Sequence, residues 1–389
     1  AGTQRNRGLI DWTLAPLLSI NPLEKLDGAV RAALRLACYE RAWLHTPAHA
    51  VAGEYAGLMR GEKLASATAF VNAVARKLPE NRRDLPRSPV FRASVEHSHP
   101  LWLVERYFER FGADEANAIL AANNTRAPLC LRVNTLKTTR EAVLPQIEGA
   151  RLSEFSRDGL VCEQSLDPTA FESWKRGEIF AQDEAAQLVA LFAAPQRENH
   201  VFDGTGAPGG KATHLAQLMG DTGRVLVGDL SEGRLKLVRQ NAQRLGLSSL
   251  ETRAGDLREI AANLRAQNEF FDIVLLDAPC LGTGTFRRRP DARWRKTPEN
   301  LAELVELQRE FLDVCAPLVK PGGVLVYSTC SLEIEENSAQ ALEFARTSGW
   351  EIVEAGDEFS RVKTPEGFLQ TWPHLHGCDG MFAAKFRRP

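Results

Sequence analysis

Apolar residues recur every three or four positions through the first part of the chain, which is the spacing of one face of a helix. In residues 26–44 the repeat includes Val30, Leu34 and Cys38. Residues 67–78 repeat the same spacing. The first 80 or so residues are therefore predicted to fold as a set of helices.

Prolines and charged residues interrupt this pattern at residues 79–89, PENRRDLPRSP, which we predict to be a linker. A helical pattern over 100–124 and a strand-like run over 129–136 follow, before another helix opens at 182–195. We place domain boundaries at residues 85 and 180. The prediction is a helical domain over 1–85, a small α+β domain over 86–180 and a third domain over 181–389.

From residue 200 the pattern changes to short apolar runs separated by turns and helical segments. The runs are rich in Val, Ile and Leu, as strands buried on both faces are. Such alternation predicts an α/β Rossmann-like domain, a parallel sheet with helices on both faces, in which ligands bind at the carboxyl ends of the strands. The five predicted strands lie within residues 200–205, 223–230, 250–256, 271–279 and 322–331.

A glycine-rich loop follows the first of these strands and opens a helix. Glycines allow a tight turn and a close approach of the backbone to a ligand, and the helix N-terminus offers free N–H groups. A Walker phosphate loop does not fit, because Thr205 and Ala212 stand where that loop needs Gly and Ser or Thr. A purely structural turn is the alternative. The residues of the loop are Thr205, Gly206, Ala207, Pro208, Gly209, Gly210 and Lys211.

Acidic residues end the next two strands. Asp229 stands at the distance from the loop at which an acid can accept hydrogen bonds from both ribose hydroxyls of an adenosine cofactor. Asp256 ends the third strand, where we expect it to reach the adenine edge. Each acid alone is more often a helix cap. Together with the loop, they favour an adenosine site.

Two cysteines follow the ends of the fourth and fifth strands, Cys280 shortly after Asp277, and Cys330. A lone cysteine among apolar residues is usually inert and buried. Neighbouring strands of one sheet, however, would bring these two thiols to one edge. A thiolate that adds to carbon 6 of a pyrimidine makes carbon 5 nucleophilic enough to take a methyl group from a sulfonium donor. We expect Asp277 to hold the ring nitrogens and the exocyclic amine meanwhile.

The net charge of -2 is unevenly distributed. Residues 1–88 hold 13 Lys and Arg against 8 Asp and Glu, whereas residues 181–389 hold 24 against 29. One basic run interrupts the acidic part, and it is either a phosphate-contacting surface or an ordinary solvated one. The run contains Arg287, Arg288, Arg289, Arg293, Arg295 and Lys296.

No stretch approaches the run of about 20 apolar residues that a membrane span needs. The start, AGTQRNRG, has no signal-peptide pattern, so we expect a cytoplasmic protein whose N-terminus is truncated. The cysteines are odd in number and include no C-x-x-C pair, which predicts free thiols and no metal site. They are Cys38, Cys130, Cys162, Cys280, Cys315, Cys330 and Cys378.

Taken together, these motifs closely resemble the bacterial 16S ribosomal RNA cytosine-5 methyltransferases related to the Sun (Fmu) protein. The resemblance rests on GAPGGK, LLDAPCLGTG, RRRPDARW, YSTCS and GCDGMFAAKFRR. Further upstream, APLCLRVNTLK is similar to the family's small RNA-contacting domain. LRLACYERAWLHTPAHAV and FVNAVARKL are similar to the NusB-like helical RNA-binding domain of its 16S-specific members.

The resemblance implies that Cys330 is the nucleophile and that Cys280 helps to release the methylated base. It also implies that the loop from Thr205 to Lys211, with Asp229, Asp256 and Asp277, lines the site for S-adenosyl-L-methionine and the base, with Lys211 close to the target cytosine. The family usually has Cys-Ala-Ala where this chain has Thr205-Gly206-Ala207, so it does not indicate what the Thr205 side chain contacts. The helical domain is expected to lack its first helices.

The predicted function is methylation of carbon 5 of a cytosine in 16S ribosomal RNA by a monomer, on the RNA alone or within a partly assembled small subunit. Three alternatives remain open. The first keeps the chemistry and changes the RNA to transfer RNA or 23S ribosomal RNA. The second is a non-catalytic NusB-like RNA-binding protein, which would not need the two motif cysteines. The third is a metabolite methyltransferase, which would not need the two upstream domains or the basic run.

Overall fold

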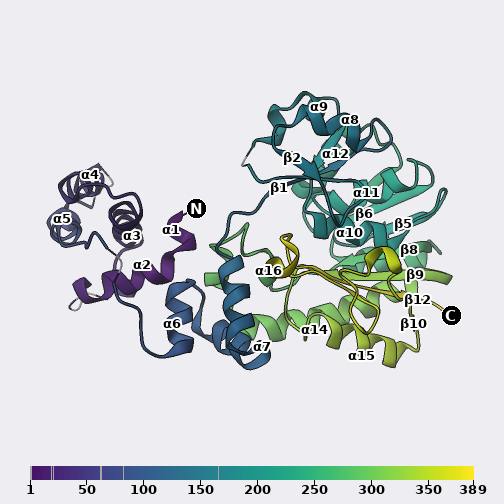
Figure 1. The fold of residues 1–389 in the computed structure, drawn as a ribbon. Coiled ribbons are helices and arrows are strands. Elements are labelled where there is room, and N and C mark those ends of the chain that lie inside the picture. The colour runs from purple at the N-terminus through teal and green to yellow at the C-terminus, as the bar shows by residue number, and fades with distance from the viewer. Residues whose placement is uncertain (1, 19, 21, 62–63, 82, 165) are drawn as a thin grey trace. The chain divides into compact units, whose positions relative to one another are not determined.

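The computed structural model describes residues 2–18, 20, 22–61, 64–81, 83–164 and 166–389, which form two compact units (Figure 1). The first comprises Ala1–Thr125 and the segment Arg289–Arg295, and the second comprises Arg126–Arg288 and Lys296–Pro389. Arg82 of the predicted linker lies outside the described residues. The finer division at residues 85 and 180 stays a prediction.

The first unit is helical, as predicted. Asp27 caps its longest early helix by accepting a hydrogen bond from the backbone N–H of Ala29, and Val30, Leu34 and Cys38 on the buried face join one apolar core. The last helix is interrupted at Gly112, whose φ of 77° is not helical, a break that periodicity alone does not reveal. The helices are α1 Gly2–Arg5, α2 Arg7–Leu14, α3 Gly28–Trp43, α4 Ala48–Gly61, α5 Thr68–Arg76, α6 Pro89–Glu96 and α7 Leu101–Ala122.

The second unit begins with a small antiparallel sheet, in which β1 Leu129–Val133 lies between β3 Gly159–Cys162 and β4 Ile179–Ala181. The edge strand β2 Ala150–Leu152 pairs with β3. Two short helices, α8 Arg140–Val143 and α9 Glu172–Lys175, accompany the sheet. The strand predicted at 129–136 is therefore confirmed, and the α+β composition of this segment with it.

A larger sheet fills the rest of the second unit, with strand order β10-β12-β9-β8-β5-β6-β7. All five predicted strands are present and pair in parallel. The sheet is mixed rather than purely parallel, because β12 pairs antiparallel with β9, β10 and β11. The strands are β5 His200–Asp203, β6 Arg224–Asp229, β7 Leu250–Ala254, β8 Phe271–Asp277, β9 Val319–Thr329, β10 Glu351–Ile352, β11 Leu369–Gln370 and β12 Phe382–Arg387.

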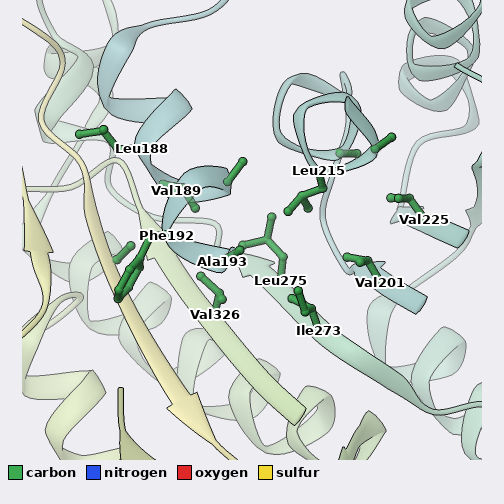
Figure 2. Close-up of a cluster of buried hydrophobic side chains, with 14 of the residues drawn as sticks. Leu188, Val189, Phe192, Ala193, Val201, Leu215, Val225, Ile273, Leu275 and Val326 are labelled. Atoms are coloured by element: carbon green, nitrogen blue, oxygen red, sulfur yellow. The ribbon is translucent and has the colours of Figure 1, made fainter. Parts of the chain in front are cut away.

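Alternate side chains of the central strands fill two cores, one on each face of this sheet. Leu275 of β8 and Val326 of β9, for example, pack under α10 Glu184–Ala193 and α11 Gly210–Leu218 (Figure 2), and α12 Glu232–Leu245 extends the same layer. The opposite face packs against α13 Leu257–Ala266, α14 Pro298–Cys315 and α15 Ser338–Ser348. A short helix, α16 Pro373–His376, precedes β12.

Arg132 of β1 joins the small sheet to the glycine-rich loop. Its fully buried guanidinium donates to the backbone O of Gly210 at 2.6 Å and to the Thr213 hydroxyl at 2.9 Å, at the start of α11. Asp158 and His214 add a second buried contact, with His214 Nε2 2.9 Å from Asp158 Oδ2. The small sheet therefore helps to fix the backbone that carries Lys211.

All seven cysteines lie in the described part of the chain and are free thiols, as predicted, and five of them are buried. Only Cys280 and Cys330 are partly exposed. Among the described residues, no helix combines the length and the apolar character that crossing a membrane requires.

Candidate active site

The carboxyl ends of the central strands meet at one edge of the large sheet. β8 and β9 are neighbours, and their register pairs Asp277 with Ser328. Cys280 and Cys330 follow these two positions by three and two residues, and their Sγ atoms lie 3.4 Å apart. The prediction that neighbouring strands bring both thiols together is therefore confirmed.

The two thiols are electrostatically unequal. The pKa of Cys330 is lowered, chiefly because the Cys280 S–H can donate a hydrogen bond to its thiolate, and the Lys211 ammonium adds attraction; burial and the Asp277 charge oppose this. The shared hydrogen bond and burial raise the pKa of Cys280 well above its ordinary value. Cys330 is therefore the thiol that ionises first, while Cys280 keeps its proton.

Asp277 is held on both carboxylate oxygens. Nζ of Lys211 lies 2.7 Å from Oδ2, and the Ser328 hydroxyl donates to Oδ1 at 2.8 Å. Burial acts to lower the pKa of Lys211, but the Asp277 carboxylate outweighs it and raises that pKa, so the lysine stays charged. Thr205 donates its hydroxyl to the backbone O of Asp277 at 2.8 Å, a contact that the resemblance did not indicate.

A cavity of about 390 Å³ opens along the same strand ends. Thr205, Ala207, Asp229, Asp256 and Asp277 are the predicted site residues that line it. Its other lining residues include Leu230, Leu257, Pro279, Leu307 and Phe311, which make much of the wall apolar. Gly206, Pro208, Gly209, Gly210 and Lys211 support the loop but do not line the cavity.

Asp229 is only 4% exposed and already has two partners. Its Oδ1 accepts the Ser231 backbone N–H at 2.9 Å, and Arg234 Nη1 lies 3.0 Å from Oδ2. Ser231, and not Asp229, caps α12, so the cap interpretation of Asp229 is wrong. The Asp229 carboxylate faces the cavity. A ribose hydroxyl that bound there would share this carboxylate with Arg234.

Asp256, by contrast, is a helix cap as well as a cavity residue. It accepts the Arg258 backbone N–H at the start of α13 and pairs with the Arg258 guanidinium at 2.6 Å. The hydrogen bonds from Arg258 lower the pKa of Asp256 to about 2. Both interpretations of this acid therefore fit the structure.

These residues suit S-adenosyl-L-methionine. The apolar wall accepts an adenine ring, and Asp229 offers an acceptor for the ribose. The turn of the loop is tight at Gly206. A Cβ at Gly206 would lie 2.5 Å from Cγ of the fully buried Asp203, so only glycine fits there.

Two loops cross beside Cys330 with no room for side chains. The backbone N–H of Gly284 donates to the Cys330 carbonyl at 3.0 Å, and the N–H of Gly380 donates to the Gly284 carbonyl at 2.9 Å. A Cβ at Gly284 would stand 2.1 Å from the Gly380 oxygen. The LGTG and GCDG motifs, about 100 residues apart in sequence, are thus parts of one structure around the nucleophile candidate.

Half of the basic run is structural, so neither of the two interpretations, a phosphate-contacting surface or a solvated one, holds for the whole run. Arg287 is buried and donates to the Gly377 carbonyl, and Arg288 links Asp183 at 2.5 Å to Asp379 at 2.7 Å. Arg293 is fully buried in the first unit, where it donates to backbone and side-chain oxygens of Asn123 and Asn124. Arg289 and Arg295 are exposed, and Arg295 pairs with the exposed Asp291 at 2.5 Å.

Several residues of the site were not predicted from the sequence. Asp203 is fully buried, and burial together with the Asp277 charge raises its pKa to about 7. Its place at a strand end before the loop was a usable signal, as was that of Ser328 within YSTC. Leu307 and Phe311 come from α14, four positions apart on one helix face, and no local motif marks them.

Comparisons with known proteins agree with this geometry. The family model described as 16S rRNA methyltransferase RsmB/F matches residues 190–387, a ferredoxin-like domain model of the same proteins matches 99–167, and the NusB family model matches 1–79. The chain is similar to the probable ribosomal RNA small subunit methyltransferase B of Bacillus subtilis, with 34% identity over 100% of this chain and 88% of the relative.

Solved structures show the same fold. The crystal structure of PH0851 matches 99% of this chain and 88% of its own, with a TM-score of 0.88 and 28% identity. A methyltransferase homologue from Pyrococcus horikoshii matches 78% of this chain and all of its own, with a TM-score of 0.67 and 27% identity. The predicted fold, a Rossmann-like domain preceded by a small α+β domain and a NusB-like helical domain, is confirmed, and the small α+β domain is ferredoxin-like. The predicted cofactor, S-adenosyl-L-methionine, is confirmed as well. The chain belongs to the RsmB/F family of 16S ribosomal RNA methyltransferases.

Proposed function

We propose that this chain methylates carbon 5 of a specific cytosine in 16S ribosomal RNA through a covalent bond between Cys330 and carbon 6 of the base. The observation that carries the proposal is the 3.4 Å distance between the Sγ atoms of Cys280 and Cys330, beside the cavity that Asp277 and Pro279 line. Methylation of an exocyclic amine needs no thiol. A non-catalytic RNA-binding protein needs neither the paired thiols nor the cavity.

Cys330 supplies the electron pair. Its thiolate, stabilised by Cys280 and Lys211, adds to carbon 6 and makes carbon 5 nucleophilic. Bound S-adenosyl-L-methionine would supply the electrophilic methyl group that carbon 5 takes, with S-adenosyl-L-homocysteine as the leaving group. The target base has to leave its stack to meet the thiol, at a cost of a few kcal/mol that is smallest for an unpaired base.

Asp277 and Lys211 hold the base and offset the negative charge that addition of the thiolate places on its ring. The Asp277 carboxylate, fixed by Ser328 and Lys211, accepts a hydrogen bond from the exocyclic amine of the base. The Lys211 ammonium offsets negative charge that builds up on the base, and it stays charged because of Asp277. Both groups are in place before the base arrives, so little reorganisation is needed during reaction.

Cys280 serves the release of the product. Elimination transfers the proton of carbon 5 to water, breaks the bond between carbon 6 and sulfur, and returns the electron pair to Cys330. The Cys280 S–H, within hydrogen-bond distance, stabilises the departing thiolate. Cys330 is therefore required for addition, and Cys280 for its reversal after methylation.

The family description names 16S rRNA and the relatives' names give the ribosomal RNA small subunit, which supports 16S ribosomal RNA as the substrate, alone or within a partly assembled small subunit. We also propose that the chain acts as a cytoplasmic monomer. Bisulfite sequencing of the RNA from cells lacking the protein tests which RNA is methylated. We expect one methylated cytosine to disappear from 16S RNA. Its loss from 23S or transfer RNA instead would overturn the 16S assignment and leave the chemistry standing.

The thiol chemistry has a separate test. Cys330→Ala is expected to lose both methyl transfer and the covalent adduct with RNA. Cys280→Ala is expected to leave addition and methylation possible, although at higher pH because Cys330 loses its main stabilising hydrogen bond, and to accumulate an adduct that migrates slowly on a denaturing gel. Cys315→Ala, which removes a buried cysteine outside the site motifs, is the matched control. An adduct in Cys330→Ala and none in Cys280→Ala would reverse the roles.

A further inference from the structure

The peptide groups on both sides of Cys280 are held by two buried side chains. Nε2 of Gln308 on α14 donates to the carbonyl of Pro279 at 2.9 Å, and Oε1 of Glu336 accepts the backbone N–H of Leu281 at 2.8 Å. Gln308 also donates to the same Glu336 oxygen at 2.9 Å. The two side chains thus form one hydrogen-bonded clamp around a single residue of the chain.

The clamp is also attached to the strand that leads to Cys330. The Tyr327 hydroxyl on β9 donates to the Glu336 carbonyl at 2.6 Å, three residues before Cys330. Glu336 itself lies in the loop between Cys330 and α15. The backbone of Cys280 is therefore fixed with respect to the strand of the other cysteine.

Burial of these groups is complete, since Gln308, Tyr327 and Glu336 are each 0% exposed. A carboxyl group in such a place loses its hydration and is stabilised only by its hydrogen-bond donors. Burial accordingly raises the pKa of Glu336, and hydrogen bonds from Ser331, Leu281 and Gln308 partly offset this. An apolar side chain would fill the same volume without that cost, so the polar contacts to the Cys280 backbone are what the pair provides.

We propose that Glu336 and Gln308 are positioning residues for the release step, which hold Cys280 so that its S–H is directed at Sγ of Cys330. The inference rests on the proposed function, because it assigns the clamp to the step in which Cys280 acts. Neither side chain lines the cavity or contacts Cys330, so addition and methyl transfer do not depend on them directly.

The test uses the full chain with unmodified 16S RNA and S-adenosyl-L-methionine, in a single-turnover assay that measures transferred methyl groups and covalent adduct together. Glu336→Ala and Gln308→Ala are expected to transfer the first methyl group at close to the normal rate, provided the assay pH is high enough to ionise Cys330 without the Cys280 hydrogen bond. Release should slow by about tenfold or more, because a misplaced hydrogen-bond donor raises the barrier to release by about 1.4 kcal/mol. Adduct should therefore accumulate as in Cys280→Ala.

Two further variants separate positioning from folding. Glu336→Gln keeps the acceptor for Leu281 and is expected to release product normally. Gln308→Met fills the volume without donating and is expected to accumulate adduct even if Gln308→Ala does not fold. Gln340→Ala is the control. This buried glutamine of α15 donates to the Val305 carbonyl of α14, the helix that carries Gln308, and touches neither neighbour of Cys280.

Epistasis provides the decisive comparison. The double variant Cys280→Ala with Glu336→Ala should accumulate no more adduct than Cys280→Ala alone, because both changes remove the same contribution. Three results would overturn the inference. They are normal release by Gln308→Met, additive accumulation of adduct in the double variant, and equal loss of methyl transfer and release in Glu336→Ala. Methylation by Cys330→Ala would instead overturn the proposed function, so the two failures are distinguishable.

Discussion

Nζ of Lys211 lies 2.7 Å from Oδ2 of Asp277, which joins the start of α11 to the end of β8 by an ion pair next to the two cysteines. Lys211 is 12% exposed and Asp277 31%, so water screens the pair only in part. The positive charge near Cys330 and the fixed carboxylate near the base site are therefore set by the same contact.

The first prediction concerns the Cys330 thiolate. Because the Cys280 hydrogen bond is the main reason for its lowered pKa and Lys211 adds less, Cys280→Ala should raise the pH midpoint of Cys330 alkylation more than Lys211→Met does. Alkylation of Cys330 by iodoacetamide, followed across pH by mass spectrometry, gives both midpoints. Equal midpoints in wild type and Cys280→Ala would show that the hydrogen bond is not the cause of the lowered pKa of Cys330.

The second prediction concerns the cofactor. Asp229→Ala removes a nearly buried acceptor and should weaken binding of S-adenosyl-L-methionine by about 1–3 kcal/mol, or roughly 5- to 150-fold. Arg234→Met frees the same carboxylate and should leave the Kd unchanged or lower. Calorimetry measures both, with Asp272→Ala at the other end of β8 as the control. Unchanged affinity in Asp229→Ala would exclude it from the site.

The third prediction concerns stability against pH. Burial lowers the pKa of His214 to about 4, below the value of about 6.5 in the unfolded chain. Between these values the unfolded chain binds the proton and the folded chain does not. Stability should therefore fall as pH drops below about 6.5, by about 2 kcal/mol at pH 5.

His214→Gln keeps a donor for Asp158 but cannot titrate, so its thermal midpoint should fall less between pH 7 and pH 5 than that of wild type. The exposed His200 in the same unit provides the control through His200→Gln, which should keep the wild-type pH dependence. An unaltered difference between pH 7 and pH 5 in His214→Gln would show that this histidine does not carry the effect.

The fourth prediction divides the basic run. Arg293→Met leaves several buried oxygens without their hydrogen-bond donor, and each such oxygen costs about 1–3 kcal/mol of folding stability. The variant should therefore have a lower thermal midpoint and an unchanged salt dependence of RNA binding. Arg289→Gln and Arg295→Gln, at exposed positions, should instead reduce the slope of log K against log salt by about 1 for each phosphate that the arginine had neutralised. An unchanged slope would make these arginines an ordinary solvated surface.

Much of the fold follows from local pattern. The alternation of apolar runs and helical segments predicts β5 to β9, since Val, Ile and Leu in short runs suit strands buried on both faces. The residues that end those strands are then the site candidates, because parallel strands present their carboxyl ends at one edge. Cys280, Cys330 and Asp229 can be identified in this way without any knowledge of packing.

The tertiary structure decided what the sequence alone does not contain. Arg293 looks like a surface charge by composition, yet oxygens about 170 residues earlier in the chain surround it and replace its water. β12 enters the sheet beside β9 although its sequence carries no sign of its partner, and Gln308 and Glu336 meet around Cys280 from two other elements. Periodicity records how each segment buries its own apolar side chains, whereas these contacts depend on which distant polar groups come together once the water between them is excluded.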